Sequence, residues 1–160
     1  MIREGTTYMD WKKVSPITVG VDPGKDTGVA IFKDKKLVEL KTFTPFTFIL
    51  WLQENKKEIT MVVFENSKLQ SHIFTGNSAN KRVGGRIGRN IGQVDGFCEI
   101  IQEMCEFYAI KCKGVSPLAK GKKITHKTFI DFVPYYNKQT NQHERDAAQV
   151  VMRFNYEYLQ

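Results

Sequence analysis

The feature that most constrains the fold of this chain is a series of short apolar runs, two of which end in a carboxylate. The run ITVGVD ends in Asp22, and the run MVVFE ends in Glu65. Short runs rich in β-branched residues and bounded by turn residues are typical of buried strands. A carboxylate that finishes such a run must be paired, exposed or bound to a cation. The sequence therefore predicts a sheet with acidic side chains at the ends of two strands.

The order of the remaining elements predicts an α/β fold. Strands are expected at residues 17–22, 28–32, 37–43, 61–65 and 109–115. The first three are joined by tight turns and form an antiparallel meander, whereas a helix from Pro45 to about Lys57, capped by Thr44, makes a crossover to a parallel strand. The result is a five-stranded mixed sheet, a three-stranded antiparallel meander plus two parallel strands, flanked by helices. Asp22 and Glu65 then end adjacent strands at the same edge.

Three further helices are expected, at residues 83–108, at 125–132 and from Asn141 to the C-terminus. Asn141 is a suitable N-cap, with Glu144 three residues later as the second half of a capping box. The intervening segments, including 66–82 and SPLAKGKK, are expected to be loops. In the long helix, glycines recur every fourth residue at Gly84, Gly88, Gly92 and Gly96. Because glycine weakens a helix, this face implies a close approach by a neighbouring strand, a partner helix or a phosphate backbone.

Size and composition favour one domain. The chain has 160 residues, 41% of them hydrophobic, so residues 1–160 are expected to form a single domain with a polar tail over residues 1–15. The three cysteines have no C-x-x-C spacing and are odd in number, which favours reduced core thiols. No apolar run approaches the ~20 residues of a membrane span, and the N-terminus does not resemble a signal peptide. A cytoplasmic, DNA-associated location is expected.

The positive charge is concentrated in the middle of the chain. Residues 66–127 carry 11 basic and 4 acidic side chains, while the whole chain has a net charge of +7. Such a cluster is the expected footprint of a polyanion, although each charge taken singly could be an ordinary solvated one. The basic residues expected to contact DNA phosphates are Lys68, Lys81, Arg82, Arg86, Arg89, Lys120, Lys122, Lys123 and Lys127.

The segment QHERDAAQVV adds two candidate ligands, His143 and Asp146, one helical turn apart. Taken alone, this pair could be an exposed first turn, and Asp22 could merely cap the turn DPG. Taken together, three carboxylates and a histidine suit a divalent-metal site. Two Mg²⁺ ions about 4 Å apart can bind one scissile phosphate, activate water and stabilise the leaving oxygen. The four residues and the basic segment predict a metal-dependent nuclease.

Successive motifs resemble those of the RuvC family of Holliday-junction resolvases, in family order and across nearly the whole chain. They are GVDPGKDTGVAIF, VVFEN, IGQVDGFCEII, the spacing of Lys120 to Lys127, and HERDAAQVV. The resemblance implies a ribonuclease H-like fold, Mg²⁺ or Mn²⁺ dependence, a homodimer and paired nicks across four-way DNA. Asp22 matches the first-strand acid of the family, and Glu65 the fourth-strand acid. His143 and Asp146 match the pair on the C-terminal helix, and Lys127 the basic residue after a glycine-containing loop.

The chain also departs from the family pattern. Where an aromatic residue for the junction centre often follows the glutamate, Lys68 is present, and Phe74 is a displaced candidate. Asp95 lies where a basic residue is common. The segment containing Lys81 and Arg82 is longer and more basic than usual. These departures favour a phage or prophage relative and leave open which branched substrate is preferred.

Other functions remain open at this point. DPGKDTG resembles the first phosphate loop of actin-like ATPases and sugar kinases, but those proteins need a second loop and an adenosine pocket, for which 160 residues leave no room. A nuclease acting on flaps, forks or RNA-containing substrates is a closer alternative. A non-catalytic nucleic-acid-binding module of the same fold is another, although it would be expected to lose at least one ligand.

Overall fold

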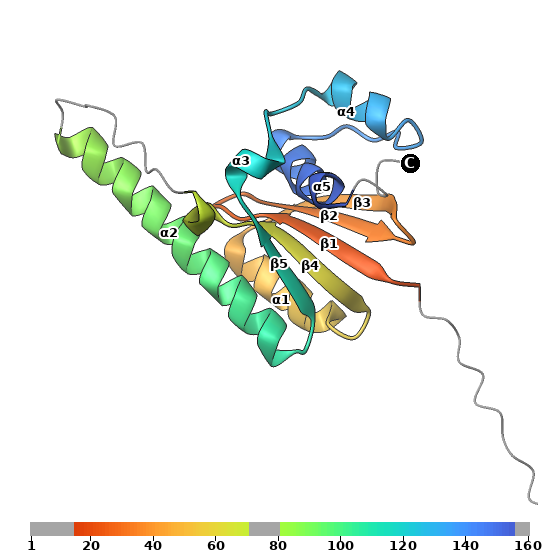
Figure 1. Cartoon of the computed structure of the whole chain (residues 1–160), viewed down its shortest axis with the longest axis horizontal. Coiled ribbons are helices and arrows are strands. Elements are labelled where there is room, and N and C mark those ends of the chain that lie inside the picture. Colours follow the sequence, from red (N-terminus) through yellow and green to blue (C-terminus); the bar gives the residue numbers. More distant parts are fainter. Residues whose placement is uncertain (1–14, 71–80, 156–160) are drawn as a thin grey trace, which may run out of the picture.

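A computed structural model describes residues 15–70 and 81–155, with side chains in the second range from residue 85 onwards (Figure 1). Its centre is a five-stranded sheet in the order β3-β2-β1-β4-β5. The strands are β1 (Ile17–Asp22), β2 (Thr27–Lys33), β3 (Lys36–Phe43), β4 (Ile59–Glu65) and β5 (Lys111–Val115). The pairs β1–β2 and β2–β3 are antiparallel, while β1–β4 and β4–β5 are parallel. The predicted mixed sheet is confirmed.

The helices largely follow the predicted pattern. They are α1 (Pro45–Asn55), α2 (Lys81–Phe107), α3 (Pro117–Lys120), α4 (His126–Phe132) and α5 (Gln142–Phe154), with a 3₁₀ turn η1 (Ser67–Leu69). Thr44 caps α1, as predicted, and Asn141 forms the predicted capping box with Glu144 at the start of α5. None of the helices within the described ranges is long and apolar enough to cross a membrane.

Several boundaries differ from the predictions: the expected loop 66–82 contains η1 and the first residues of α2, and β5 begins two residues later than expected. Two differences change an element. The segment SPLAKGKK, expected to be a loop, contains α3, because the Ser116 side chain accepts a hydrogen bond from the Leu118 amide and Pro117 suits the first helical position. The last helix, expected to reach the C-terminus, ends at Phe154, where the amide of Asn155 bonds to the Val151 carbonyl and the backbone turns extended.

Helices cover both faces of the sheet (Figure 1). α1 and α2 lie on one face, and α5 lies on the other with α4 beyond it. Side chains of β4 alternate accordingly: Val62 and Phe64 join the core beneath α1 and α2, whereas Val63 joins the core beneath α5. Burial on both faces explains why the central strands read as continuous apolar runs rather than alternating ones.

α5 lies unusually close to the sheet because two strand positions have no side chain. A Cβ atom on Gly20 of β1 would lie 2.2 Å from the Ala147 carbonyl oxygen, and one on Gly28 of β2 would lie 2.0 Å from the His143 carbonyl oxygen. Both separations are far below van der Waals contact, so only glycine permits this approach. The two glycines therefore set how near the N-terminal half of α5 comes to the end of β1.

The glycine face of α2 has no partner within the described part of the chain. Ideal Cβ atoms on Gly88, Gly92 and Gly96 would meet no atom within 4 Å. Of the three partners considered for this face, a neighbouring strand of the same chain is thus wrong at these three positions. A partner helix from a second copy and a phosphate backbone stay predictions.

Candidate active site

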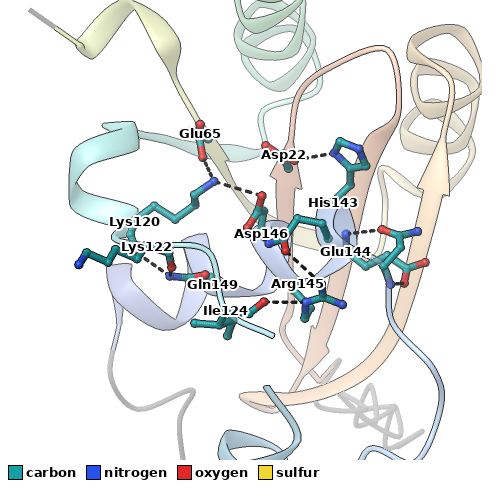
Figure 2. Close-up of polar contacts among 12 residues, drawn as sticks. Asp22, Glu65, Lys120, Lys122, Ile124, His143, Glu144, Arg145, Asp146 and Gln149 are labelled. Carbon is teal, nitrogen blue, oxygen red and sulfur yellow. Dashed lines mark hydrogen bonds and ion pairs between the residues drawn. The ribbon is translucent and has the colours of Figure 1, made fainter. Parts of the chain in front are cut away.

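The parallel pairing of β1 with β4 brings two acidic residues to one edge of the sheet. Val21 pairs with Phe64, so Asp22 and Glu65 end neighbouring strands at the same level. This is the arrangement predicted from the crossover connection, since the carboxyl ends of parallel strands meet at one edge. Both side chains are largely buried, with 15% and 19% of their surfaces exposed. Figure 2 shows them facing residues of α5 and the segment around α3.

The first two turns of α5 supply the remaining candidate ligands. The Nδ1 atom of His143 lies 3.2 Å from Oδ2 of Asp22, and these residues are 121 positions apart in the sequence. Asp146, one turn further along, is nearly buried and accepts a hydrogen bond from the Gln142 amide at 2.7 Å. The structure thus brings Asp22, Glu65, His143 and Asp146 to one end of the sheet (Figure 2).

A lysine lies among these carboxylates. The ammonium group of Lys120, at the end of α3, forms a close ion pair with Glu65 and lies 3.5 Å from Oδ2 of Asp146. Only 6% of Lys120 is exposed. Sequence reasoning assigned this residue to phosphate contact along with the other basic residues. The structure places it inside the acidic cluster, whereas the nearby Lys122 and Lys123 are exposed. The sequence did not signal this difference, because the three lysines lie in one short basic segment and look alike there.

The electrostatics of the cluster favour a cation. Burial raises the pKa of Asp22 to about 6, the positive charge of Lys120 opposes this rise, and the nearby carboxylate of Glu65 adds to it. Burial by itself would lower the pKa of Lys120, but its ion pairs with Glu65 and Asp146 raise the pKa above its ordinary value. Three acids held together at a buried strand edge are mutually repulsive unless positive charge lies between them. Lys120 supplies that charge here.

These residues fit a divalent cation in chemistry, with a difference from the prediction. Three carboxylates and an imidazole are suitable donors for Mg²⁺ or Mn²⁺. Among the described residues, however, no three His, Cys, Asp or Glu side chains already stand as a group able to hold a metal ion. Their oxygens are directed to Lys120, Gln142 and His143 instead. The ammonium group marks the point at which the negative charge converges.

Contacts behind the site hold the end of β4 against α2. Ser67 donates a hydrogen bond of 2.5 Å to Asp95, and the thiol of Cys98 donates to the Glu65 carbonyl at 3.5 Å. Asp95, noted in the sequence because a basic residue is common at its position, therefore contacts the segment that follows Glu65. Its carboxylate accepts a hydrogen bond from Ser67 and so helps to hold this segment against α2.

The other predicted DNA-binding residues lie apart from the cluster. Lys68 pairs with Glu99 on α2, and Arg86 and Arg89 are exposed on that helix. Exposed lysines also follow α3 and lie on α4, namely Lys122, Lys123 and Lys127. Phe74 and the side chains of Lys81 and Arg82 lie outside the described residues.

Sequence reasoning missed three residues that shape the site. Gly20 and Gly28 admit α5 to the sheet, and Gln149, buried on α5, holds the segment that carries Lys120. A signal existed for the glycines, because a glycine in the middle of a buried strand often marks a close approach by another backbone. The signal for Gln149 was weaker: it is a polar residue within the apolar face of the helix.

The strand order and the helices on both faces of the sheet define the fold class. It is a ribonuclease H-like fold, a five-stranded mixed sheet flanked by helices. No protein-family model matches the sequence, and no curated protein matches it. Among solved structures, it is similar to "T. thermophilus RuvC in complex with Holliday junction substrate". The TM-score is 0.57, and the alignment covers 89% of this chain and 93% of that chain at 10% sequence identity. At such low identity the likeness is one of fold.

Proposed function

We propose that this chain is a metal-dependent, structure-selective DNA endonuclease that resolves Holliday junctions by paired nicks. The observation that carries the proposal is the meeting of Asp22, Glu65, His143 and Asp146 around a buried ammonium group at the carboxyl ends of β1 and β4. The motif order in the sequence and the similarity of fold to a junction-bound structure support it.

Asp22, Glu65, His143 and Asp146 would hold two Mg²⁺ or Mn²⁺ ions. When bound, such ions lower the pKa of attacking water and stabilise negative charge on the scissile phosphate and the leaving 3′ oxygen. The donor set is dominated by carboxylates, which suits Mg²⁺. Burial of Asp22 and Asp146 keeps these oxygens from bulk water, so their attraction for a cation is weakly screened.

Two groups of the chain, His143 in addition to its place among the ligands and Lys120, would act on the substrate directly. His143 is held by Asp22 at Nδ1 and has 47% of its side chain exposed, so its other ring nitrogen can exchange a proton with water or with the leaving oxygen. Lys120 carries positive charge among the acids, and its three donors suit a phosphate oxygen. On substrate binding, its ammonium group would shift from the carboxylates towards that phosphate.

The exposed basic residues would bind the arms of the junction. Arg86, Arg89, Lys122, Lys123 and Lys127 are exposed on α2, α4 and the segment after α3. Contacts with phosphate are independent of base sequence and release counterions, so binding should weaken steeply with salt. We further propose a homodimer, since paired nicks need two sites. The glycine face of α2 is its candidate interface, with Ile87 and Ile100 more than 40% exposed on the same helix.

The test is a panel of end-labelled four-way junction, fork, flap, duplex and RNA–DNA hybrid substrates, incubated with the protein in Mg²⁺ and mapped on both strands. Wild-type protein should nick the junction symmetrically. Asp146→Asn keeps the side-chain shape but should reduce cleavage at least about 10³-fold, because the carboxylate charge is removed. Asp131→Asn changes an exposed acid on α4 and serves as the matched control, with unchanged cleavage.

Other outcomes of this panel would point elsewhere. Preferred cutting of flaps, forks or the hybrid would assign a different substrate to the same site. Binding of the junction without any cleavage in Mg²⁺ or Mn²⁺ would indicate a non-catalytic binding module of this fold. Equal cleavage by wild type and Asp146→Asn would show that the cluster is not the active site.

A further inference from the structure

A glutamine of α5 holds the backbone on both sides of the turn that follows Lys120. The side-chain nitrogen of Gln149 donates hydrogen bonds to the carbonyl oxygens of Lys120 and Lys122, at 2.8 Å and 2.9 Å (Figure 2). The glutamine lies one turn beyond Asp146 on the same helix. It is deeply buried, since only 3% of its surface is exposed.

The chemistry of this contact leaves one orientation for the amide. Backbone carbonyls only accept hydrogen bonds, so the NH₂ group of Gln149 must face them. Its Oε1 atom is then buried, with no hydrogen-bond partner among the described residues. The neighbours of Gln149 on α5, Ala148 and Val150, belong to the apolar core. An apolar side chain of the same length would avoid a buried, unpaired oxygen, so packing by itself does not account for a glutamine here.

The two carbonyls lie on either side of a backbone turn that aims Lys120 into the site. Gly121 has φ +85° and ψ −166°, a conformation open essentially to glycine only. It follows Lys120 directly and ends α3. Held on both sides of this turn, the segment directs the Lys120 side chain towards Glu65 and Asp146. Lys120 ends α3, and residues 121–125 after it have no helix or strand pairing. The two bonds from Gln149 hold the start of this stretch, while Arg145 of α5 holds its later part through the Ile124 carbonyl.

We propose that Gln149 is a positioning residue, which holds Lys120 in the acidic cluster through its backbone and so sets where the lysine charge meets the scissile phosphate. The inference about catalysis rests on the proposed nuclease function, whereas the inference about position does not. Because Asp146 and Gln149 belong to the same helix, α5 positions both the Asp146 carboxylate and the backbone from which the Lys120 side chain extends.

The first test needs no substrate. In metal-free wild-type protein, acylation of Lys120 by acetic anhydride, followed by mass spectrometry and normalised to exposed Lys127, should be slow. Gln149→Met has similar length but no donors, and it should raise the relative labelling of Lys120 about tenfold, as the removal of two hydrogen bonds would. Gln149→Asn keeps the amide but is too short to reach both carbonyls, and it should give an intermediate increase.

A matched control separates position from general loss of stability. Met152 lies on α5 beside the same small cavity of about 70 Å³ that Gln149 lines. Met152→Ala should lower the melting temperature of the protein at least as much as Gln149→Met does, yet leave Lys120 protected. Unchanged labelling of Lys120 in both Gln149 variants, or equal exposure of Lys120 in Met152→Ala, would overturn the positional role.

The second test uses junction cleavage. Gln149→Met should lower kcat about 10-fold, the usual effect of removing a supporting residue, and leave KM for the junction within about twofold. In a Lys120→Met background, Gln149→Met should have no further effect, because Gln149 acts only through that lysine. Additive decreases would refute the catalytic part. If wild-type protein cleaves nothing, the proposed function fails while the labelling result still decides the role of Gln149.

Discussion

Gly28→Ala should separate α5 from the sheet at the point where His143 begins to face Asp22. The new Cβ would lie 2.0 Å from the His143 carbonyl oxygen and 2.3 Å from its carbonyl carbon. Both are backbone atoms of a helix, so no side-chain rotation relieves the overlap. Ordinary contact requires about 3.5 Å, and the two backbones must therefore part by more than about 1 Å.

Such a displacement has a cost in stability and a larger one in activity. Overpacking of a buried position typically costs about 1–3 kcal/mol, which for a chain of this length lowers the melting temperature by roughly 3–10 °C. His143 and Asp22, which are 3.2 Å apart in the wild-type protein, would move out of hydrogen-bond range. A misplacement of about 1 Å at a reacting group reduces turnover by about 100-fold, so activity should fall far more than the folded fraction does.

The measurements are thermal melts with and without Mg²⁺ and single-turnover cleavage of the four-way junction. Gly24→Ala is the matched control, because a Cβ at Gly24, in the turn between β1 and β2, would have a single neighbour at 3.7 Å, which is an ordinary van der Waals distance. It should behave as wild type. Wild-type melting and cleavage in Gly28→Ala would show that α5 does not rest on β2 as described and would undermine the geometry of the site.

Three further predictions concern charge and association. Burial raises the pKa of Asp22 from 3.8 to about 6, so the metal-free protein loses stability as pH rises through this interval. Asp22→Asn should therefore raise the melting temperature of the metal-free protein at pH 8. The same variant should abolish the increase in melting temperature that we expect when Mg²⁺ is added to wild-type protein. Charge reversal of Arg86 and Arg89 should lower the salt slope of junction binding by about 0.9 for each phosphate that these side chains no longer neutralise, and an unaltered slope would exclude a role for them in phosphate binding. Gly92→Ala should weaken the proposed dimer in sedimentation velocity, although the alanine itself favours the helix by about 1 kcal/mol; a dimer of undiminished stability would place the interface elsewhere.

The fold was largely accessible from local patterns. The strand ending in Asp22 and the strand ending in Glu65 were recognisable because both faces of each are buried, which leaves short continuous apolar runs. Thr44 before Pro45 marked the start of α1, and Asn141 marked that of α5, because capping is a local interaction within four residues. The short helix α3 was missed for the opposite reason, since one turn of helix has no apolar periodicity to detect.

The depth of the site was not accessible in the same way. Lys120 and Lys122 look alike in the sequence, yet the first is buried against Glu65 and the second is exposed. Nothing local distinguishes them, because burial of Lys120 depends on two carboxylates distant along the chain and on Gln149 behind it. Charge counting treated the two lysines as equivalent.

The order of strands and helices, the acids at the strand ends and the pair of candidate ligands on one helix turn can all be read from the amino-acid sequence, since each follows from hydrophobic period, turn residues and capping within short windows. The position of Lys120 among those acids, and the close approach of α5 that Gly20 and Gly28 allow, are properties of the folded chain. They cannot be read locally because charge pairing joins Lys120 to acids on two other elements, and close packing joins the glycines to helix residues more than a hundred positions away, at distances that the whole backbone sets.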